Sequence, residues 1–129
     1  THLLECQVRG ANDKETARVL AKSVISSSLV KAAFFGKDAN WGRILCALGY
    51  SGGNFSPEKT NLSFQSDVGE ILVFEQGIPL DFDEEAAKKI LNEKEIKILV
   101  SLSDGDACAK AWGCDLTYDY VKINGDYRT

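Results

Sequence analysis

Residues 95–102 constrain the fold most strongly, because apolar side chains recur there at every second position. The alternating apolar residues are Ile96, Ile98, Val100 and Leu102. A period of two predicts a β-strand that buries one face, and such a strand needs partner strands and a covering layer. Residues 1–8 show the same pattern, with Leu4, Cys6 and Val8 on one side.

Other segments are expected to be helices. Residues 17–25 repeat apolar side chains three and four positions apart, as an amphipathic helix does. Further helices are expected at residues 41–48, about 83–91 and in a short stretch around 116–123, followed by a tail, 124–129. Asn12 with Glu15 resembles a capping box before the first helix. Asp38 or Asn40 can begin the second helix, and Asp83 the third.

The remaining apolar runs are expected to be strands. They cover residues 29–35, 62–66 and 71–74, and residues 107–112 are expected to return from a turn at 104–106 as the second strand of a hairpin. This order of elements predicts an α+β fold: a single domain, residues 1–129, with a mixed or antiparallel sheet covered by two to three helices. A chain of 129 residues can bury one core of this kind but not two.

Composition and charge exclude several classes of protein. Hydrophobic residues make up 44% and charged residues 26% of the chain, which is ordinary for a globular protein and excludes a disordered polymer. Fifteen basic and nineteen acidic side chains leave a net charge of −4, so neither nucleic acid nor an anionic membrane is an expected partner. No apolar run approaches the roughly 20 residues that a membrane-spanning helix needs.

The cysteines predict neither a disulfide framework nor a metal site. Cys108 and Cys114 are too far apart for the two-residue spacing of structural zinc sites, and His2 is the only histidine. We expect all four cysteines, which include Cys6 and Cys46, to be reduced and to act as small apolar side chains in a reducing compartment.

A few residues suggest chemistry from their type and position. A free N-terminal threonine such as Thr1 can act as a nucleophile, but the sequence shows no oxyanion hole around Thr1, and the first residue of a strand is the favoured interpretation. Trp41 can fill the core, and Arg43 can either clamp a carboxylate or pair with a surface acid. The segment 124–129 has side chains that bind polar groups, although polar chain ends usually fray.

Two blocks of sequence carry a resemblance to a known family. Residues 38–45 resemble the Asp-Pro-Asn-Trp-Gly-Arg-Ile block of the ornithine acetyltransferases, also called bifunctional glutamate N-acetyltransferases of arginine biosynthesis. Residues 112–129 are similar to the C-terminal signature of that family. This chain has Ala39 where the family usually has proline and Gly125 where alanine is common. The resemblance extends over essentially the whole chain.

The resemblance implies an acetyltransferase that matures by cutting itself. In this family the precursor is cleaved before an internal threonine, and the two subunits stay together. The new N-terminal threonine takes acetyl from N-acetylornithine and passes it to glutamate, and some members also accept acetyl-CoA. The family needs no metal, and no cofactor is expected. Arginine biosynthesis of this kind implies the cytoplasm, or an organelle if a transit peptide has been removed.

The resemblance also implies which part of the enzyme this chain represents. Residues 1–129 match the C-terminal part of the β subunit, so the acetyl-carrying threonine lies upstream and Thr1 is not the nucleophile. We therefore expect no catalytic residue in the chain. Asn124 and Thr129 match substrate-binding positions of the family. The expected partners are the α subunit and the rest of the β subunit, in a heterotetramer.

Two other functions remain open from the sequence. One is a paralogous N-acyltransferase that uses a different acyl acceptor, which the upstream pocket residues would distinguish. The other is a non-catalytic assembly domain that only holds subunits together. Loss of substrate binding on changing Asn124 would argue against the assembly domain.

Overall fold

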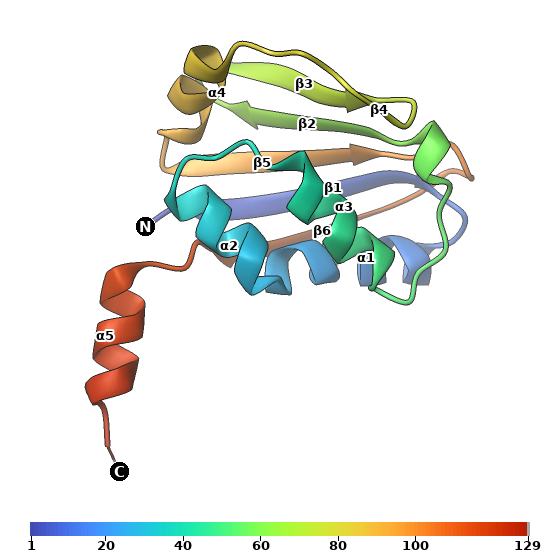
Figure 1. Ribbon diagram of the computed structural model, residues 1–129. Coiled ribbons are helices and arrows are strands. Elements are labelled where there is room, and N and C mark those ends of the chain that lie inside the picture. Colours follow the sequence, from blue (N-terminus) through green and yellow to red (C-terminus); the bar gives the residue numbers. More distant parts are fainter. Residues whose placement is uncertain (129) are drawn as a thin grey trace.

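The computed structural model describes residues 1–128. In these residues six strands form one mixed sheet, in the order β4-β3-β2-β5-β1-β6 (Figure 1). The strands are β1 (Leu3–Ala11), β2 (Asn61–Ser66), β3 (Gly69–Glu75), β4 (Ile78–Pro79), β5 (Glu95–Ser101) and β6 (Ala107–Cys114). In this described part of the chain β1 and β5 pair in parallel, and the other neighbouring strands are antiparallel. The predicted α+β fold with a mixed sheet is confirmed.

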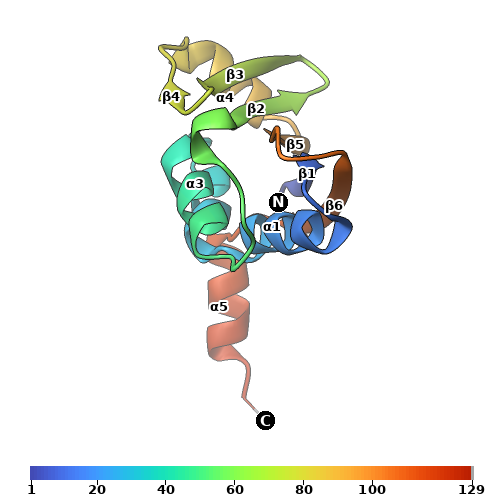
Figure 2. The same ribbon diagram turned by 90° about the vertical axis from the view of Figure 1, so that its right-hand side faces the viewer.

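Four helices cover one face of this sheet, and a fifth stands apart from it (Figure 2). The helices are α1 (Lys14–Ser26), α2 (Ser28–Phe35), α3 (Trp41–Gly49), α4 (Glu84–Leu91) and α5 (Tyr118–Asp126), with a 3-10 turn at Pro57–Lys59. Helix α1 lies against β1 and β6, and α4 lies against β2 and β3. A single apolar core joins the sheet to these four helices.

The strands contribute alternate residues to that core, as their period predicts. Leu4 and Cys6 of β1 and Ile98 of β5 are fully buried under the helices. Within residues 1–128 no helix lies over the opposite face of the sheet, which carries mostly polar side chains, such as Glu5 and Lys97. The domain is therefore two-layered, with one covered and one open sheet face.

The segment predicted as a strand at residues 29–35 is instead helix α2. Ser27 ends α1 and also caps α2, because its side-chain oxygen accepts a hydrogen bond from the Val30 backbone N–H at 3.2 Å. Val30, Ala33 and Phe34 then point into the core at helical spacing. The apolar run is short, and a short run alone does not distinguish a strand from a buried helix. The covering layer therefore contains one helix more than expected from the sequence.

The predicted hairpin is also wrong, because β6 pairs with β1 and not with β5. The connection after β5 crosses the end of β1, where the backbone N–H groups of Asp104 and Gly105 donate to the Gly10 carbonyl at 2.9 and 3.0 Å. Gly10 has a φ of +77°, and a Cβ on it would overlap the backbone of Leu102. The sequence predicts the turn at residues 104–106, but it does not show which strand β6 pairs with, because that partner lies about 100 residues away in the chain.

The helix starts agree with the sequence in two of three cases. Asn40 and Asp83 cap α3 and α4 as predicted. The capping residue of α1 is Asp13 and not Asn12, since an Asp13 carboxylate oxygen accepts from the Thr16 backbone N–H at 2.7 Å.

The cysteine expectation holds only in part. Cys6 is buried in the core, and burial strongly raises the pKa of its thiol. The other three thiols, Cys46, Cys108 and Cys114, are exposed, so they do not act as core side chains.

We predict that Gly10→Ala destabilises the domain by more than about 2 kcal/mol, because it forces a side chain into a left-handed conformation and against Leu102. Gly49→Ala is the matched control, since a Cβ at Gly49 meets nothing within 4 Å and Gly49 is helical. We expect the control to stay within about 1 kcal/mol of the unchanged chain. Urea denaturation of both variants measures the difference, and equal midpoints would contradict the account of the β1 turn.

Candidate functional site

The predicted site residue Asn124 lies in α5, the helix that projects from the body of the domain (Figure 1). The sequence predicted that the helix ends before Asn124, but it continues to Asp126. The Asn124 side-chain amide donates to the Tyr120 carbonyl of its own helix at 2.9 Å. Its Oδ1 accepts no hydrogen bond within residues 1–128, so this atom is available to a ligand. The second predicted site residue, Thr129, lies outside the described residues.

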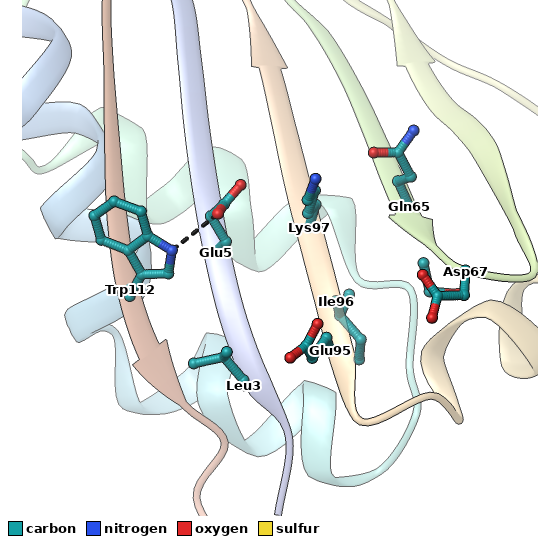
Figure 3. A pocket seen from close by; sticks show the side chains of 9 residues that line it. Leu3, Glu5, Gln65, Asp67, Glu95, Ile96, Lys97 and Trp112 are labelled. Atoms are coloured by element: carbon teal, nitrogen blue, oxygen red, sulfur yellow. Dashed lines mark hydrogen bonds between the residues drawn. The ribbon is translucent and has the colours of Figure 1, made fainter.

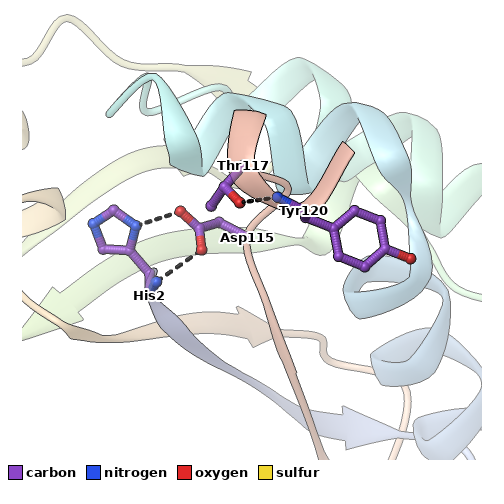
Figure 4. Close-up of polar contacts among 4 residues, drawn as sticks. All are labelled: His2, Asp115, Thr117 and Tyr120. Atoms are coloured by element: carbon purple, nitrogen blue, oxygen red, sulfur yellow. Dashed lines mark hydrogen bonds and ion pairs between the residues drawn. The ribbon is translucent and has the colours of Figure 1, made fainter. Parts of the chain in front are cut away.

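Contacts between His2 and Asp115 fix the position at which α5 begins. Asp115 follows β6, and its carboxylate oxygens accept from the His2 backbone N–H and contact the His2 Nδ1, both at 2.7 Å (Figure 4). The Asp115 backbone N–H donates in turn to the His2 carbonyl at 3.3 Å. The two side chains are 12% and 1% exposed, so this contact is shielded from water. His2 and Asp115 together form what we call the terminal clasp.

The charge state of Asp115 reflects these contacts. Burial by itself raises the pKa of a carboxyl group, but the hydrogen bonds from the His2 backbone and imidazole outweigh it. The pKa of Asp115 is therefore held below its ordinary value. The carboxylate is charged at neutral pH and can hold both donors of His2.

Two further contacts anchor the start of α5 to α2, and a third caps the helix. The Leu116 backbone N–H donates to the Lys31 carbonyl at 3.3 Å. The rings of Phe35 and Tyr118 meet edge to face, with centroids 4.9 Å apart. The Thr117 hydroxyl oxygen caps the helix by accepting from the Tyr120 backbone N–H at 3.0 Å (Figure 4). The base of α5 is thus held to the domain, while its remaining turns extend beyond the body of the domain.

Among residues 1–128, α5 carries exposed polar side chains but no assembled catalytic group. The His2 imidazole is engaged by Asp115. No group of three His, Cys, Asp or Glu side chains in that part of the chain is arranged to hold a metal ion. An amide on an exposed helix can orient a polar ligand, but it cannot by itself transfer an acyl group.

A second candidate is a shallow pocket of about 240 Å³ on the open sheet face (Figure 3). The Trp112 indole N–H donates to the Glu5 carboxylate across this face at 2.9 Å. Hydrogen bonds from Gln7 and Trp112, with the positive charge of Lys110 and Lys97, lower the pKa of Glu5. Glu5 is thus already partnered within this sheet face, and nothing in the geometry of the pocket selects a ligand.

Trp41 and Arg43 have structural contacts. The Trp41 ring stacks on Phe74, with centroids 5.5 Å apart, as expected of a core residue. The Arg43 guanidinium donates to the Leu29 carbonyl at 2.9 Å and so joins the starts of α2 and α3. Arg43 therefore contacts a backbone carbonyl rather than the surface acid that the sequence suggested, and the contact agrees with its structural interpretation.

The terminal clasp was missed by sequence reasoning. His2 was considered only as a lone histidine, and Asp115 was not singled out at all. The two residues are 113 positions apart, so no local pattern connects them. The one available signal was an aspartate directly after an apolar strand, where an unpaired charge is costly.

With this geometry in place, comparison with known proteins shows the family. A family model described as "ArgJ family" matches residues 1–129, and the chain belongs to this family. It is 52% identical over 129 residues to the arginine biosynthesis bifunctional protein ArgJ of Thermotoga neapolitana, covering 32% of that protein. It is 50% identical to a glutamate N-acetyltransferase of Methanopyrus kandleri, covering 33% of it.

A solved structure shares the fold. The crystal structure of the arginine biosynthesis bifunctional protein ArgJ from Bacillus halodurans matches 98% of this chain with a TM-score of 0.91 at 45% identity. The match covers 58% of that solved chain. The chain spans about a third of the length of the curated relatives that it matches.

The described helices include none that is long and apolar enough to cross a membrane.

We predict that Asp115→Asn lowers the free energy of unfolding by about 2 kcal/mol at neutral pH, because a charged acceptor of two hydrogen bonds is lost. Asp119→Asn is the control, since Asp119 is exposed in the first turn of α5. The control is expected to cost less than about 0.5 kcal/mol.

The contribution of Asp115 should also depend on pH. Since folding lowers its pKa, its stabilisation is complete above the ordinary value of 3.8 and is lost as the pH falls through the folded value. Urea denaturation between pH 7 and acid pH should therefore show the Asp115→Asn penalty shrinking toward zero. A penalty that stays constant into acid would contradict the charged clasp.

Proposed function

We propose that this chain is the C-terminal part of the β subunit of a bifunctional glutamate N-acetyltransferase of arginine biosynthesis. The observation that carries the proposal is the agreement with ArgJ relatives over all 129 residues at about 50% identity. The 0.91 TM-score against a solved ArgJ chain supports the same assignment for the fold.

In the proposed reaction a threonine outside this chain carries the acetyl group. Its hydroxyl oxygen attacks the acetyl carbonyl of N-acetylornithine, the amide bond breaks, and ornithine leaves with the proton. The amine of glutamate then attacks the threonine ester, and N-acetylglutamate forms as the hydroxyl is restored. The same threonine becomes N-terminal when the precursor cleaves itself. The proposed reaction admits acetyl-CoA as a second acetyl donor, and no metal or cofactor takes part in it.

The role of this chain in the reaction is to hold the amino-acid part of the substrate. Asn124 presents an amide on an exposed helix, and its Oδ1 accepts nothing from residues 1–128. Thr129 supplies a hydroxyl five residues later. An amide and a hydroxyl together can bind the α-carboxylate that N-acetylornithine and glutamate share. These two groups are therefore the substrate-binding residues of the proposal.

The partners of this chain are the other parts of its own enzyme. It assembles with the α subunit and the rest of the β subunit, as two αβ pairs in a heterotetramer. The acidic net charge of −4 argues against nucleic acid as a partner. The enzyme works in the cytoplasm, or in an organelle if its source imports it.

We predict that Asn124→Ala in the full-length enzyme lowers kcat/KM for acetyl transfer from N-acetylornithine to glutamate about 10- to 100-fold, the effect of one lost substrate hydrogen bond. Thr129→Ala should act in the same direction. Lys122→Ala is the matched control, because Lys122 lies on the same helix and makes only an exposed ion pair with Asp126 at 3.8 Å. Steady-state assays of the three self-cleaved variants measure the difference.

The outcomes separate the proposed function from its rivals. Equal rates for the Asn124 variant and its control would contradict the site assignment and favour a non-catalytic assembly domain. No acetyl transfer to glutamate by the unaltered enzyme, with turnover of another acceptor, would favour a paralogous N-acyltransferase.

A further inference from the structure

Asp115 is the last buried residue of the described chain. It is 3% exposed, whereas residues 118–128 are all exposed. Asn124 lies in that exposed stretch, and its side-chain hydrogen bond stays within α5. The position of Asn124 relative to the domain therefore depends on how firmly the base of α5 is held.

The terminal clasp is the best shielded of the contacts at that base. The Asp115 carboxylate accepts from the His2 backbone N–H and contacts the His2 Nδ1, both at 2.7 Å (Figure 4). Tyr118, in contrast, is 81% exposed, so its ring contact with Phe35 borders water. The backbone hydrogen bond to α2 is longer, at 3.3 Å. Hydrogen bonds to a charged group that is shielded from water are stronger than neutral or exposed ones, so the clasp dominates the hold on α5.

The clasp fixes an orientation as well as a position. Oδ1 of Asp115 accepts the His2 backbone N–H, and Oδ2 meets the His2 Nδ1, so each oxygen holds a separate group. A carboxylate only accepts hydrogen bonds, and Nδ1 therefore carries the hydrogen. Two contacts through separate oxygens restrain rotation of the residue that leads into α5.

A small tilt at this base displaces Asn124 by a distance that matters for binding. Asn124 is the seventh residue of α5 and lies about 9 Å along the helix from Tyr118, since each residue adds about 1.5 Å. A tilt of about 10° moves it by about 1.5 Å, and a displacement of about 1 Å is enough to lose a well-aligned hydrogen bond.

We propose that His2 and Asp115 are positioning residues for substrate binding: the terminal clasp sets the direction of α5 and so places the Asn124 amide against the α-carboxylate of the substrate. This inference rests on the proposed function, in which Asn124 binds the carboxylate that N-acetylornithine and glutamate share. Neither clasp residue contacts the substrate or takes part in acyl transfer. Both act through Asn124.

Two variants of His2 in the full-length enzyme separate the clasp from the rest of the fold. His2→Leu removes the Nδ1 donor. His2→Asn keeps an N–H donor in the same place, because its amide nitrogen is bonded to Cγ as Nδ1 is. Asp13→Ala is the stability control, since it removes the cap of α1 at the other end of β1 from His2.

Steady-state kinetics distinguish misplacement of Asn124 from loss of folded enzyme. We expect His2→Leu to lower kcat/KM about tenfold for both N-acetylornithine and glutamate, while kcat changes less than about threefold, as loss of substrate binding does. His2→Asn should stay within about twofold of the unaltered enzyme. Asp13→Ala lowers only stability and should leave KM unchanged. An unchanged KM in the His2→Leu enzyme, or equal losses in both His2 variants, would overturn the proposal.

A double-mutant cycle tests whether the clasp acts through Asn124. In an Asn124→Ala enzyme, His2→Leu should cause no further loss, because the side chain that it misplaces is already absent. A further loss of about tenfold would overturn the proposal, since the two effects would then be independent. No effect of Asn124→Ala by itself would contradict the proposed function and this inference together. An effect of Asn124→Ala without one of His2→Leu would overturn the inference alone.

Hydrogen exchange of the same enzymes measures the base of α5 without an assay of activity. The Asp115 backbone N–H donates to the His2 carbonyl and the Leu116 N–H to the Lys31 carbonyl, both at 3.3 Å. His2→Leu should speed exchange of these two amides at least about tenfold, and His2→Asn should leave them protected. Unchanged exchange in the His2→Leu enzyme would overturn the role of the clasp.

Discussion

The pairing of β1 on both of its sides is the constraint on which the rest of the structure depends. β1 lies between β5, its parallel partner, and β6, its antiparallel partner. Its side chains Leu4, Cys6 and Val8 are fully buried beneath the helices. A strand inserted in this way cannot shift by one residue without turning its apolar side toward the open face. The register of β1 thereby sets the position of both neighbouring strands.

Both ends of β1 carry a contact that depends on this register. At one end the left-handed turn at Gly10 receives the connection from β5 to β6. At the other end His2 contacts Asp115, the residue that directly follows β6. Helix α5 begins directly after that contact, so the position of the exposed helix is determined by the central strand. The structure thus connects a buried β-sheet register to a surface that carries a candidate substrate-binding residue.

Much of the fold was predictable because its signals are local. The alternation in residues 95–102 and the caps Asn40 and Asp83 each act within one element, and each prediction is confirmed. Residues 29–35 were misassigned because a short apolar run fits a strand as well as a buried helix. The partner of β6 was misassigned because strand pairing depends on residues far apart in the chain.

The residues of the candidate site could be predicted only in part, and not from local patterns. Asn124 and Thr129 were singled out only through resemblance to a family, because an exposed amide and a hydroxyl have no pattern of their own. Asp115 was missed because its partner is 113 residues away. The projection of α5 was also not predictable, since the spacing of its apolar residues indicates a helix but not what covers it.

The central claim is that α5 carries a substrate-binding residue to a site completed by the rest of the enzyme. A crystal structure of the full-length enzyme with ornithine bound tests it most directly. The account predicts the Asn124 side chain within about 3 Å of the amino-acid group of ornithine, at hydrogen-bonding distance. Ornithine bound elsewhere, with Asn124 facing solvent, would contradict it.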